Sequence, residues 1–417
     1  MRVVAICPFL PFPGVGHAGG EFAYRHLEHL SRRHEVTVVG LSTPGNLGFV
    51  SRVPPGFNLR PLLGVPAPHT VLGRLRQQVL GRLRWQVLSL PPHELGAMLA
   101  PVAGDLRAAD VIELHWGGWL LPIVGALRRV APKASIVVVP YDVPWQAYAR
   151  MAALDATGPL GRRATGLSFA AFRRWQVALF QRTDAVLVLK EDDRLLLRRA
   201  GVHRPAVLVV DPPLEVPGAE AIRARRERPA GRTVLFTGAF DRPENHRSAL
   251  WFLDSVWPMV KARGAGARLV LAGAEPPAAL RARAGDGVTV TGYVESLTPW
   301  YEEADVFVAP LIAGAGLKFK VPQAMVHGLA VVATPLAVEG VVDEAGVEMF
   351  GAVTDDPIEM AAALVELLAR PGHQRELGER GRRWATARYD FEASTSRVVE
   401  LYESLSRPGP GPRLARP

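Results

Sequence analysis

Two lysines beside a run of small residues are the clearest candidates for chemistry in this chain. Ala313–Gly316 is a Gly/Ala loop, and Lys318 and Lys320 follow it at the start of a segment with helical periodicity. Such a loop leaves backbone N–H groups free at the positive end of the helix dipole, where an anion can bind. Phosphate is the natural ligand, although two solvated lysines beside an ordinary turn would give the same local pattern.

The elements on either side must position these lysines. The apolar run Val306–Pro310 is predicted to be a buried parallel strand, and Leu329–Thr334 is predicted to be the next one. Gly328 is predicted to end the helix between them. The lysines are therefore expected where a buried strand gives way to a helix.

The string from Gly314 to Met325, GAGLKFKVPQAM, resembles the nucleotide-sugar site of retaining, family-4-type glycosyltransferases with the GT-B fold, the glycosyl transferases of group 1. The continuation Val331–Val341 fits the same pattern. The family typically has Glu where this chain has Gln323, and many members have a second Glu at the position of Ala315. These departures motivate an alternative, a catalytically silent sugar-nucleotide-binding relative that supports a partner enzyme. A nucleotide-sugar epimerase of similar architecture is a third interpretation.

The resemblance implies an α/β chain with two Rossmann-like doubly wound domains that face a central cleft. It also implies transfer of a hexosyl group from a nucleotide diphosphate-sugar donor to an acceptor, with retention of configuration. The acceptor would be a small natural product, or a lipid-linked or polysaccharide precursor. The nucleotide sugar is a substrate, and neither a cofactor nor a metal ion is expected.

The resemblance also assigns roles to residues. Lys318, Lys320 and the amides of 315–317 would neutralise the charge that grows on the departing diphosphate. Gln323 would face the ribose hydroxyls, and Glu339 would lie near the sugar or pyrophosphate. Because a carboxylate accepts stronger hydrogen bonds than an amide, Gln323→Glu is expected to tighten donor binding with fold stability nearly unchanged. The residues assigned to donor binding are Gly19, Gly20, Arg242, Tyr293, Val294, Ala315, Gly316, Leu317, Gln323 and Glu339.

Several of these assignments have structural alternatives. Gly19 and Gly20 resemble the family's N-terminal glycine loop, but a plain tight turn before a helix explains them equally well. Arg242 is either a phosphate contact or a solvated turn residue. Tyr293 and Val294 follow a short strand that resembles the family's base-binding segment.

Two polar residues at predicted strand ends in the first half are further catalytic candidates. Asp110–His115 and Ser135–Pro140 are predicted to be strands, and His115 ends the first while Asp142 follows the second. Ligands bind at the carboxyl ends of strands in doubly wound sheets, so both side chains are candidates to face the cleft. A histidine at a strand end is as often structural.

The α/β alternation runs through the first half and starts again after a charged, Pro-rich stretch. The predicted division is a first domain at 1–210, a linker at 211–232 and a nucleotide-sugar domain at 233–388. A helix at 389–406 would cross back to the first domain, and 407–417 would be a disordered tail.

Composition limits the class of protein. A chain of 417 residues with 48% hydrophobic content can build two domains, and its single Cys7 suits a reducing cytoplasm. No apolar run reaches the ~20 residues of a membrane span. The net charge of +9 favours anionic partners, but no nucleic-acid motif and no Cys/His metal cluster appears.

One basic stretch suggests contact with a membrane surface. Val71–Leu88 places Leu72, Leu75 and Val79 on one helical face, with arginines mostly elsewhere. Such a helix can lie on an anionic membrane or receive an acidic acceptor. An ordinary surface helix packed on the first sheet is the alternative, and it is favoured.

Overall fold

The computed structural model describes residues 1–417 except 16, 61–62, 65–74, 76–87, 89, 91, 147, 150–157, 230, 264–265, 315, 342–343 and 407–417. Most of the predicted basic helix at 71–88, the predicted tail and Ala315 lie outside the described residues.

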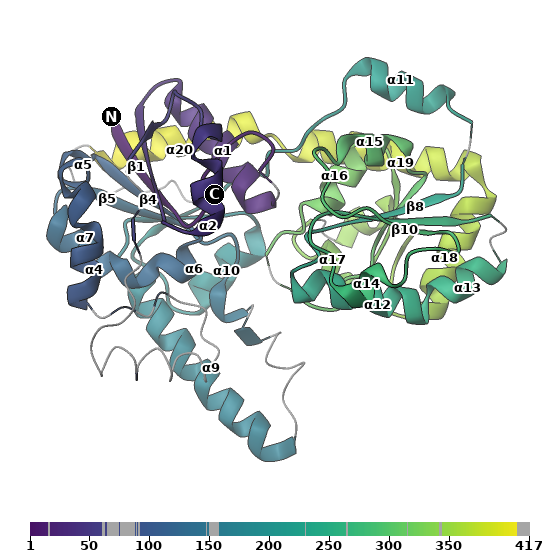
Figure 1. The fold of residues 1–417 in the computed structure, drawn as a ribbon, viewed down its shortest axis with the longest axis horizontal. Coiled ribbons are helices and arrows are strands. Elements are labelled where there is room, and N and C mark those ends of the chain that lie inside the picture. Colours follow the sequence, from purple (N-terminus) through teal and green to yellow (C-terminus); the bar gives the residue numbers. More distant parts are fainter. Residues whose placement is uncertain are drawn as a thin grey trace. The chain divides into compact units, whose positions relative to one another are not determined.

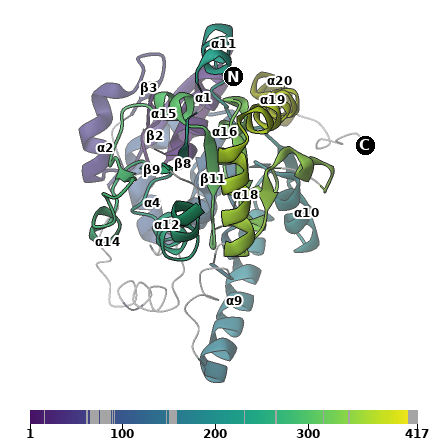
Figure 2. The ribbon, with the colours of Figure 1, turned by 90° about the vertical axis from the view of Figure 1, so that its right-hand side faces the viewer.

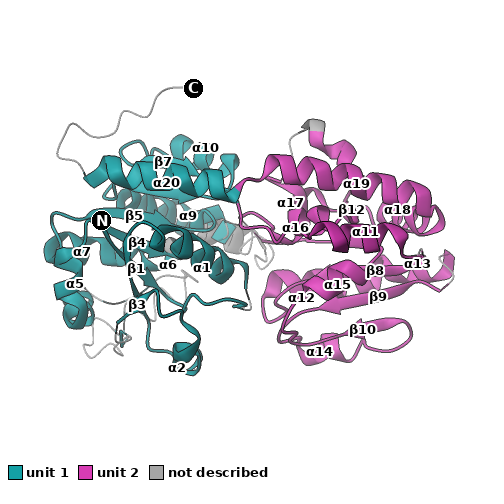
Figure 3. Ribbon diagram, turned by 90° about the horizontal axis from the view of Figure 1, so that it is seen from above, with its two compact units in different colours: residues 1–211, 391–417 teal, residues 212–390 magenta. Residues whose placement is uncertain are grey.

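The described chain divides into two compact units (Figure 3). Unit 1 comprises Met1–Asp211 and Phe391–Pro417, and unit 2 comprises Pro212–Asp390. The last helix, α20 (Phe391–Ser406), belongs to unit 1, where it packs beside α1 (Ala18–Ser31).

Unit 1 is organised around a seven-stranded parallel sheet in the order β3-β2-β1-β4-β5-β6-β7. The strands are β1 (Arg2–Cys7), β2 (Glu35–Gly40), β3 (Asn58–Leu59), β4 (Val111–His115), β5 (Ser135–Val139), β6 (Ala185–Val188) and β7 (Ala206–Val209). Their central Val/Ile/Leu runs are buried, as expected for parallel strands covered by helices. Because the strand order reverses between β1 and β4, the carboxyl ends of these two strands mark the topological switch point.

Helices surround this sheet. They are α1, α2 (Pro44–Phe49), α4 (Pro92–Leu99), α5 (Ala103–Ala108), α6 (Gly117–Leu120), α7 (Val124–Val130), α9 (Gly158–Phe180), α10 (Glu191–Arg199) and α20, with 3-10 turns at Val50–Arg52, Ala100–Val102 and Leu121–Ile123. The long α9 extends outward past the other helices of unit 1 (Figures 1 and 2).

Unit 2 repeats the plan with a six-stranded parallel sheet in the order β10-β9-β8-β11-β12-β13. The strands are β8 (Thr233–Thr237), β9 (Arg268–Ala272), β10 (Val288–Val290), β11 (Val306–Ala309), β12 (Ala330–Ala333) and β13 (Ala352–Val353). Here the order reverses between β8 and β11, so the loop that carries the two lysines leaves the sheet at the switch point. The prediction of two Rossmann-like parallel sheets is confirmed.

Helices cover both faces of the second sheet. They are α11 (Ala219–Glu227), α12 (Pro243–Ser255), α13 (Trp257–Arg263), α14 (Ala278–Arg281), α15 (Thr298–Glu303), α16 (Lys320–Val326), α17 (Pro335–Val338), α18 (Pro357–Ala369) and α19 (Pro371–Arg388), with a 3-10 segment at Glu344–Met349. One face carries α12, α13 and α18, and the other carries α15, α16 and α19 (Figures 1 and 2).

The stretch predicted to be an irregular linker contains a helix. α11 lies within 211–232 and, because it buries none of its residues, it shows no apolar periodicity in the sequence. Arginines attach it instead, by donating hydrogen bonds to backbone carbonyls of unit 2.

Candidate functional site

The loop between β11 and α16 is held by hydrogen bonds to neighbouring elements of unit 2. The N–H of Ile312 donates to Ser248 Oγ on α12 at 3.1 Å, and the carbonyl of Leu311 accepts from Thr334 Oγ1 at 2.7 Å. Gly314 and Gly316 have φ values of 120° and 70°, in the region that glycine tolerates best. These glycines therefore let the chain turn sharply from β11 toward α16.

Lys318 lies on this loop and Lys320 is the first residue of α16, and each ammonium group has a defined partner. Lys318 is 8% exposed, and its Nζ donates to the carbonyl of Gly316 at 2.7 Å. Lys320 Nζ donates to Asn245 Oδ1 at 2.7 Å and lies 4.7 Å from the centre of the Phe236 ring, a cation–π distance. The structure thus brings the two cations together at the switch point of unit 2.

The surroundings of Lys320 are electropositive. Its pKa is lowered to about 7, first because burial removes water from the ammonium group, and further because Arg242 and Lys318 lie nearby. Glu244 acts in the opposite direction. A bound polyanion would favour the protonated amine again. The loop is therefore electrostatically prepared for a phosphate group.

Asn245 is a member of this site that sequence reasoning missed. Its Nδ2 donates to the carbonyl of Ala239 at 2.8 Å, so the amide is oriented with Oδ1 toward Lys320. A Cβ atom at Gly238 would lie 3.1 Å from Lys320 Nζ, so glycine leaves the space that the ammonium group uses. The available signal was an asparagine in the first turn of α12, directly after the polar loop that follows β8.

The helix that follows ends as predicted. Gly328 has a φ of 75°, its N–H donates to the carbonyl of Met325, and the N–H of Leu329 donates to the carbonyl of Ala324. This pair of bonds is a Schellman motif, in which a glycine closes the C-terminus of a helix.

Gln323, on the same helix, is engaged by the backbone of Glu215. Its Oε1 accepts from the N–H of Glu215 at 3.0 Å, and its Nε2 donates to the carbonyl of the same residue at 2.8 Å. An amide satisfies both partners because it has a donor and an acceptor, whereas an ionised carboxylate has no donor. This gives a physical reason for Gln at the position where the family has Glu.

The other predicted donor residues of unit 2 are spread around the carboxyl edge of its sheet. Arg242 is the N-cap residue of α12, and Glu339 is the C-cap residue of α17. Tyr293 is 60% exposed and Val294 is half-buried in the turn after β10. Of these residues, Arg242 acts electrostatically on Lys320.

In unit 1, His115 is fully buried at the end of β4 and belongs to a polar chain. Its Nδ1 lies 2.7 Å from the hydroxyl of Tyr141, and its Nε2 lies 3.5 Å from Glu113 Oε1. His26 Nε2, on α1, lies 2.8 Å from the same oxygen. Burial alone would raise the pKa of Glu113, but His26 and His115 hold it well below its ordinary value. His115 is therefore shielded from solvent, with Glu113 and Tyr141 as its polar neighbours.

The residues that follow β4 and β5 have unusual backbones. Trp116 and Tyr141 have φ values of 54° and 65°, which are costly for residues with large side chains. Tyr141 is half-buried, as is Asp142 beside it. Burial raises the pKa of the Tyr141 hydroxyl well above its usual value, so this group stays protonated. Strained backbone at this edge of the sheet is consistent with a functional position.

The predicted glycine loop of unit 1 is part of a helix. Gly19 and Gly20 lie in the first turn of α1, and Nδ1 of the N-cap residue His17 accepts from the N–H of Gly20 at 2.9 Å. A Cβ atom at Gly20 would come within 2.7 Å of Val15, and one at Gly19 would lie 3.7 Å from the Tyr141 ring. The glycines thus allow close packing where α1 begins.

Comparison with solved structures identifies the fold that the two parallel sheets form. The chain superposes on sucrose-phosphate synthase from Thermosynechococcus elongatus with a TM-score of 0.68 at 19% identity, covering 97% of this chain and 98% of that one. It also superposes on Anabaena HepE, solved with UDP and glucose, with a TM-score of 0.66 at 12% identity, covering 97% and 100%. The fold is that of the GT-B glycosyltransferases.

The sequence matches are concentrated on part of the chain. Residues 231–370 match the family model described as glycosyl transferases group 1. A phosphatidyl-myo-inositol mannosyltransferase of Mycolicibacterium smegmatis is 31% identical over 189 residues, which are 43% of this chain and 47% of the relative. The chain thus spans about half the length of the curated relatives it matches. Residues 231–370 of this chain therefore resemble the group 1 glycosyltransferases.

Two properties of the described residues concern membrane spans and metal sites. None of their helices is long and apolar enough to cross a membrane. Within the same part of the chain, no group of three His, Cys, Asp or Glu side chains is placed to hold a metal ion.

Proposed function

We propose that this protein is a glycosyltransferase whose unit 2 binds the diphosphate of a nucleotide sugar through Lys318 and Lys320. The observation that carries the proposal is the pair of lysines at the switch point of the second sheet, where Arg242 adds to the positive field. The group 1 match covers this region.

In the proposed reaction, the bond between the anomeric carbon and the departing diphosphate oxygen breaks, and a bond from that carbon to an acceptor oxygen forms. The acceptor's proton passes to the departing phosphate or to solvent. Negative charge grows on the diphosphate as it leaves, and cations fixed beside it stabilise that charge without further reorganisation. Lys318 and Lys320 supply these cations, so the reaction is proposed to need no divalent metal. Retention of configuration is proposed from the resemblance to the retaining family.

The proposed sugar is a hexose and the proposed acceptor is a hydroxyl of a lipid-linked molecule, with the reaction at the cytoplasmic face of the membrane. The matching relative from Mycolicibacterium smegmatis, which is described as a mannosyltransferase of a phosphatidylinositol, supports this choice. A small soluble acceptor is the other outcome that an acceptor screen would distinguish.

The test begins with a panel of nucleotide sugars, because a ligand that binds only the folded state raises the melting temperature. The best donor is then incubated with candidate acceptors, and release of nucleoside diphosphate is measured with and without EDTA. We expect acceptor-dependent release that survives EDTA. Loss with EDTA and rescue by Mn²⁺ would contradict the metal-independent mechanism.

A second candidate is a protein that binds the sugar nucleotide without transferring the sugar. The hydrogen bonds that engage Gln323 with Glu215 favour it, because they occupy both polar atoms of the side chain expected at the ribose. Donor binding with no diphosphate release in the presence of any acceptor would favour this candidate.

A further inference from the structure

A second positively charged site lies on unit 2, in a cavity of about 270 Å³ beside α11 and α19. Five arginines line it, from α11, from the residue after it and from α19. They are Arg225, Arg226, Arg228, Arg375 and Arg382. Asp305, Glu376 and Glu379 are the carboxylates of the lining, so the cations outnumber them by two.

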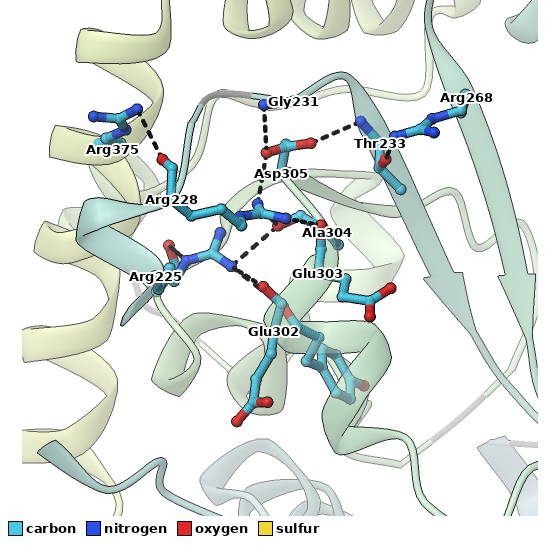
Figure 4. Close-up of polar contacts among 12 residues, drawn as sticks. Arg225, Arg228, Gly231, Thr233, Arg268, Glu302, Glu303, Ala304, Asp305 and Arg375 are labelled. Atoms are coloured by element: carbon cyan, nitrogen blue, oxygen red, sulfur yellow. Dashed lines mark hydrogen bonds and ion pairs between the residues drawn. The ribbon is translucent and has the colours of Figure 1, made fainter. Parts of the chain in front are cut away.

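Two of these carboxylates, Asp305 and Glu379, form ion pairs with three of the arginines. Arg228 lies 2.7 Å from Asp305, while Arg226 and Arg382 lie 2.9 Å and 2.7 Å from Glu379. Asp305 also accepts hydrogen bonds from the N–H groups of Gly231 and Thr233, where the chain enters β8 (Figure 4). Its carboxylate therefore has a structural role in unit 2.

Arg225 and Arg375 have backbone partners instead. Arg225 donates to the carbonyl of Gly328, at the end of α16, and to carbonyls at the end of α15 (Figure 4). Arg375 donates to the carbonyl of Arg228 at 3.4 Å. Among the described residues, neither guanidinium group is within ion-pair distance of a carboxylate, so the excess of two positive charges in the lining is left to be balanced from outside.

The electrostatics of Arg225 agree with this geometry. Its pKa is lowered to about 10, first by burial and then by the neighbouring charges of Arg228 and Arg375, with Asp305 opposing. Three guanidinium groups that destabilise one another create a positive potential in a partly desolvated cavity. An anion there would gain more than it would at an exposed surface.

We propose that this cavity binds a phosphate-type oxyanion. Planar guanidinium groups match phosphate oxygens with paired hydrogen bonds, and several of them converge here. The volume lies just below the roughly 300–1,000 Å³ range of sites for larger organic ligands, which favours a small anion with some of its water. The same chemistry is offered by free inorganic phosphate and by a phosphomonoester such as glycerol 3-phosphate.

The experiment measures binding of inorganic phosphate to the full chain by calorimetry at constant ionic strength, with chloride as the exchanged anion. Lys318→Ala separates this cavity from the proposed donor site, because phosphate that binds beside the lysines is lost in that variant. Arg375→Gln tests the cavity, and Arg263→Gln, an exposed arginine of α13 in the same unit, is the control of equal charge change.

We expect Lys318→Ala to retain one phosphate site, the cavity, and Arg263→Gln to bind phosphate as the wild type does. Arg375→Gln should weaken the cavity site about tenfold, as loss of a charged hydrogen-bond donor commonly does. Arg225→Gln, checked for folding by circular dichroism, should weaken it further. Equal affinity of Arg375→Gln and Arg263→Gln would overturn the proposal, as would complete loss of phosphate binding in Lys318→Ala. A parallel titration with glycerol 3-phosphate distinguishes a free anion from a phosphomonoester.

Discussion

The two parallel sheets place different chemistry at their switch points. In unit 2, Lys318 and Lys320 follow β11, and burial, together with the nearby charges of Arg242 and Lys318, lowers the pKa of Lys320. In unit 1, Glu113 lies between His26 and His115. The first region holds charge that a ligand can neutralise, and the second satisfies its charge internally. A few side chains therefore decide whether the edge of a Rossmann-like sheet presents cations or buries a polar network.

The strongest test of this contrast is removal of a cation from unit 2. Lys318→Ala should lower kcat/KM by about 10²–10³, because losing one group that stabilises developing negative charge typically has this effect. Steady-state rates with the best donor and acceptor measure it. Lys261→Ala, a lysine of α13 outside the loop, is the matched control and should stay within about twofold. Near-normal activity of a folded Lys318→Ala protein would contradict the placement of the phosphate site.

The matching test in unit 1 should change stability. Glu113→Gln should lower the free energy of unfolding by roughly 2–4 kcal/mol, since it disrupts a buried charged network. Urea denaturation measures it, and Tyr141→Phe, which loses one hydrogen bond of the same chain, should cost about 1 kcal/mol. If Glu113→Gln were as stable as wild type, the network would not support the fold.

Acid should remove the difference in stability between wild type and Glu113→Gln. The folded-state pKa of Glu113 is depressed, so its contribution is complete above the unfolded value of about 4.3 and is lost as pH falls toward the lower folded value. The stability gap between the two proteins should therefore narrow below about pH 4.3. In urea titrations, a gap that stays constant down to about pH 3 would contradict this assignment of charge.

Sequence patterns predicted those strands and helix ends whose formation depends on residues close together in the chain. The apolar runs before and after the lysines became β11 and β12, and Gly328 closes α16. The contacts that tune the site join residues far apart in the chain. Asn245 and Lys320 are 75 positions apart, and Glu215 and Gln323 are 108 apart. Periodicity cannot predict such pairs, because they depend on how separate elements pack.

A smaller effect is expected from the titration of Lys320. With a pKa of about 7 in the free protein, this amine must take up a proton when a diphosphate binds at higher pH. Affinity for an uncleaved nucleotide sugar should then fall with pH above about 7, by at most tenfold per unit, and the titration of Lys320 should cause no change in affinity well below pH 7. Calorimetry from pH 6 to 9 measures the slope.

Lys320→Met should bind the donor more weakly and lose this slope. Wild-type affinity that is unchanged between pH 7 and 9 would mean that Lys320 does not face the diphosphate.

The smallest expected effect concerns Gln323, where sequence and structure lead to different expectations for stability. The sequence alone predicts that Gln323→Glu tightens donor binding with the fold unaffected. In the structure, Nε2 of Gln323 donates to the carbonyl of Glu215, and a carboxylate would replace that bond with repulsion between oxygens. Gln323→Glu should therefore raise hydrogen exchange in residues 212–218. It should also lower the donor Kd several-fold, because the carboxylate is released to accept from the ribose.

Gln323→Met separates the two effects, since it removes the bonds to Glu215 without adding a charge. It should show the faster exchange without the gain in affinity. Exchange that is unchanged in both variants would mean that the bonds to Glu215 do not hold the segment. Weaker donor binding by Gln323→Glu would mean that this position does not contact the ribose. In that case, Gln would be retained in this chain for the backbone of Glu215 alone.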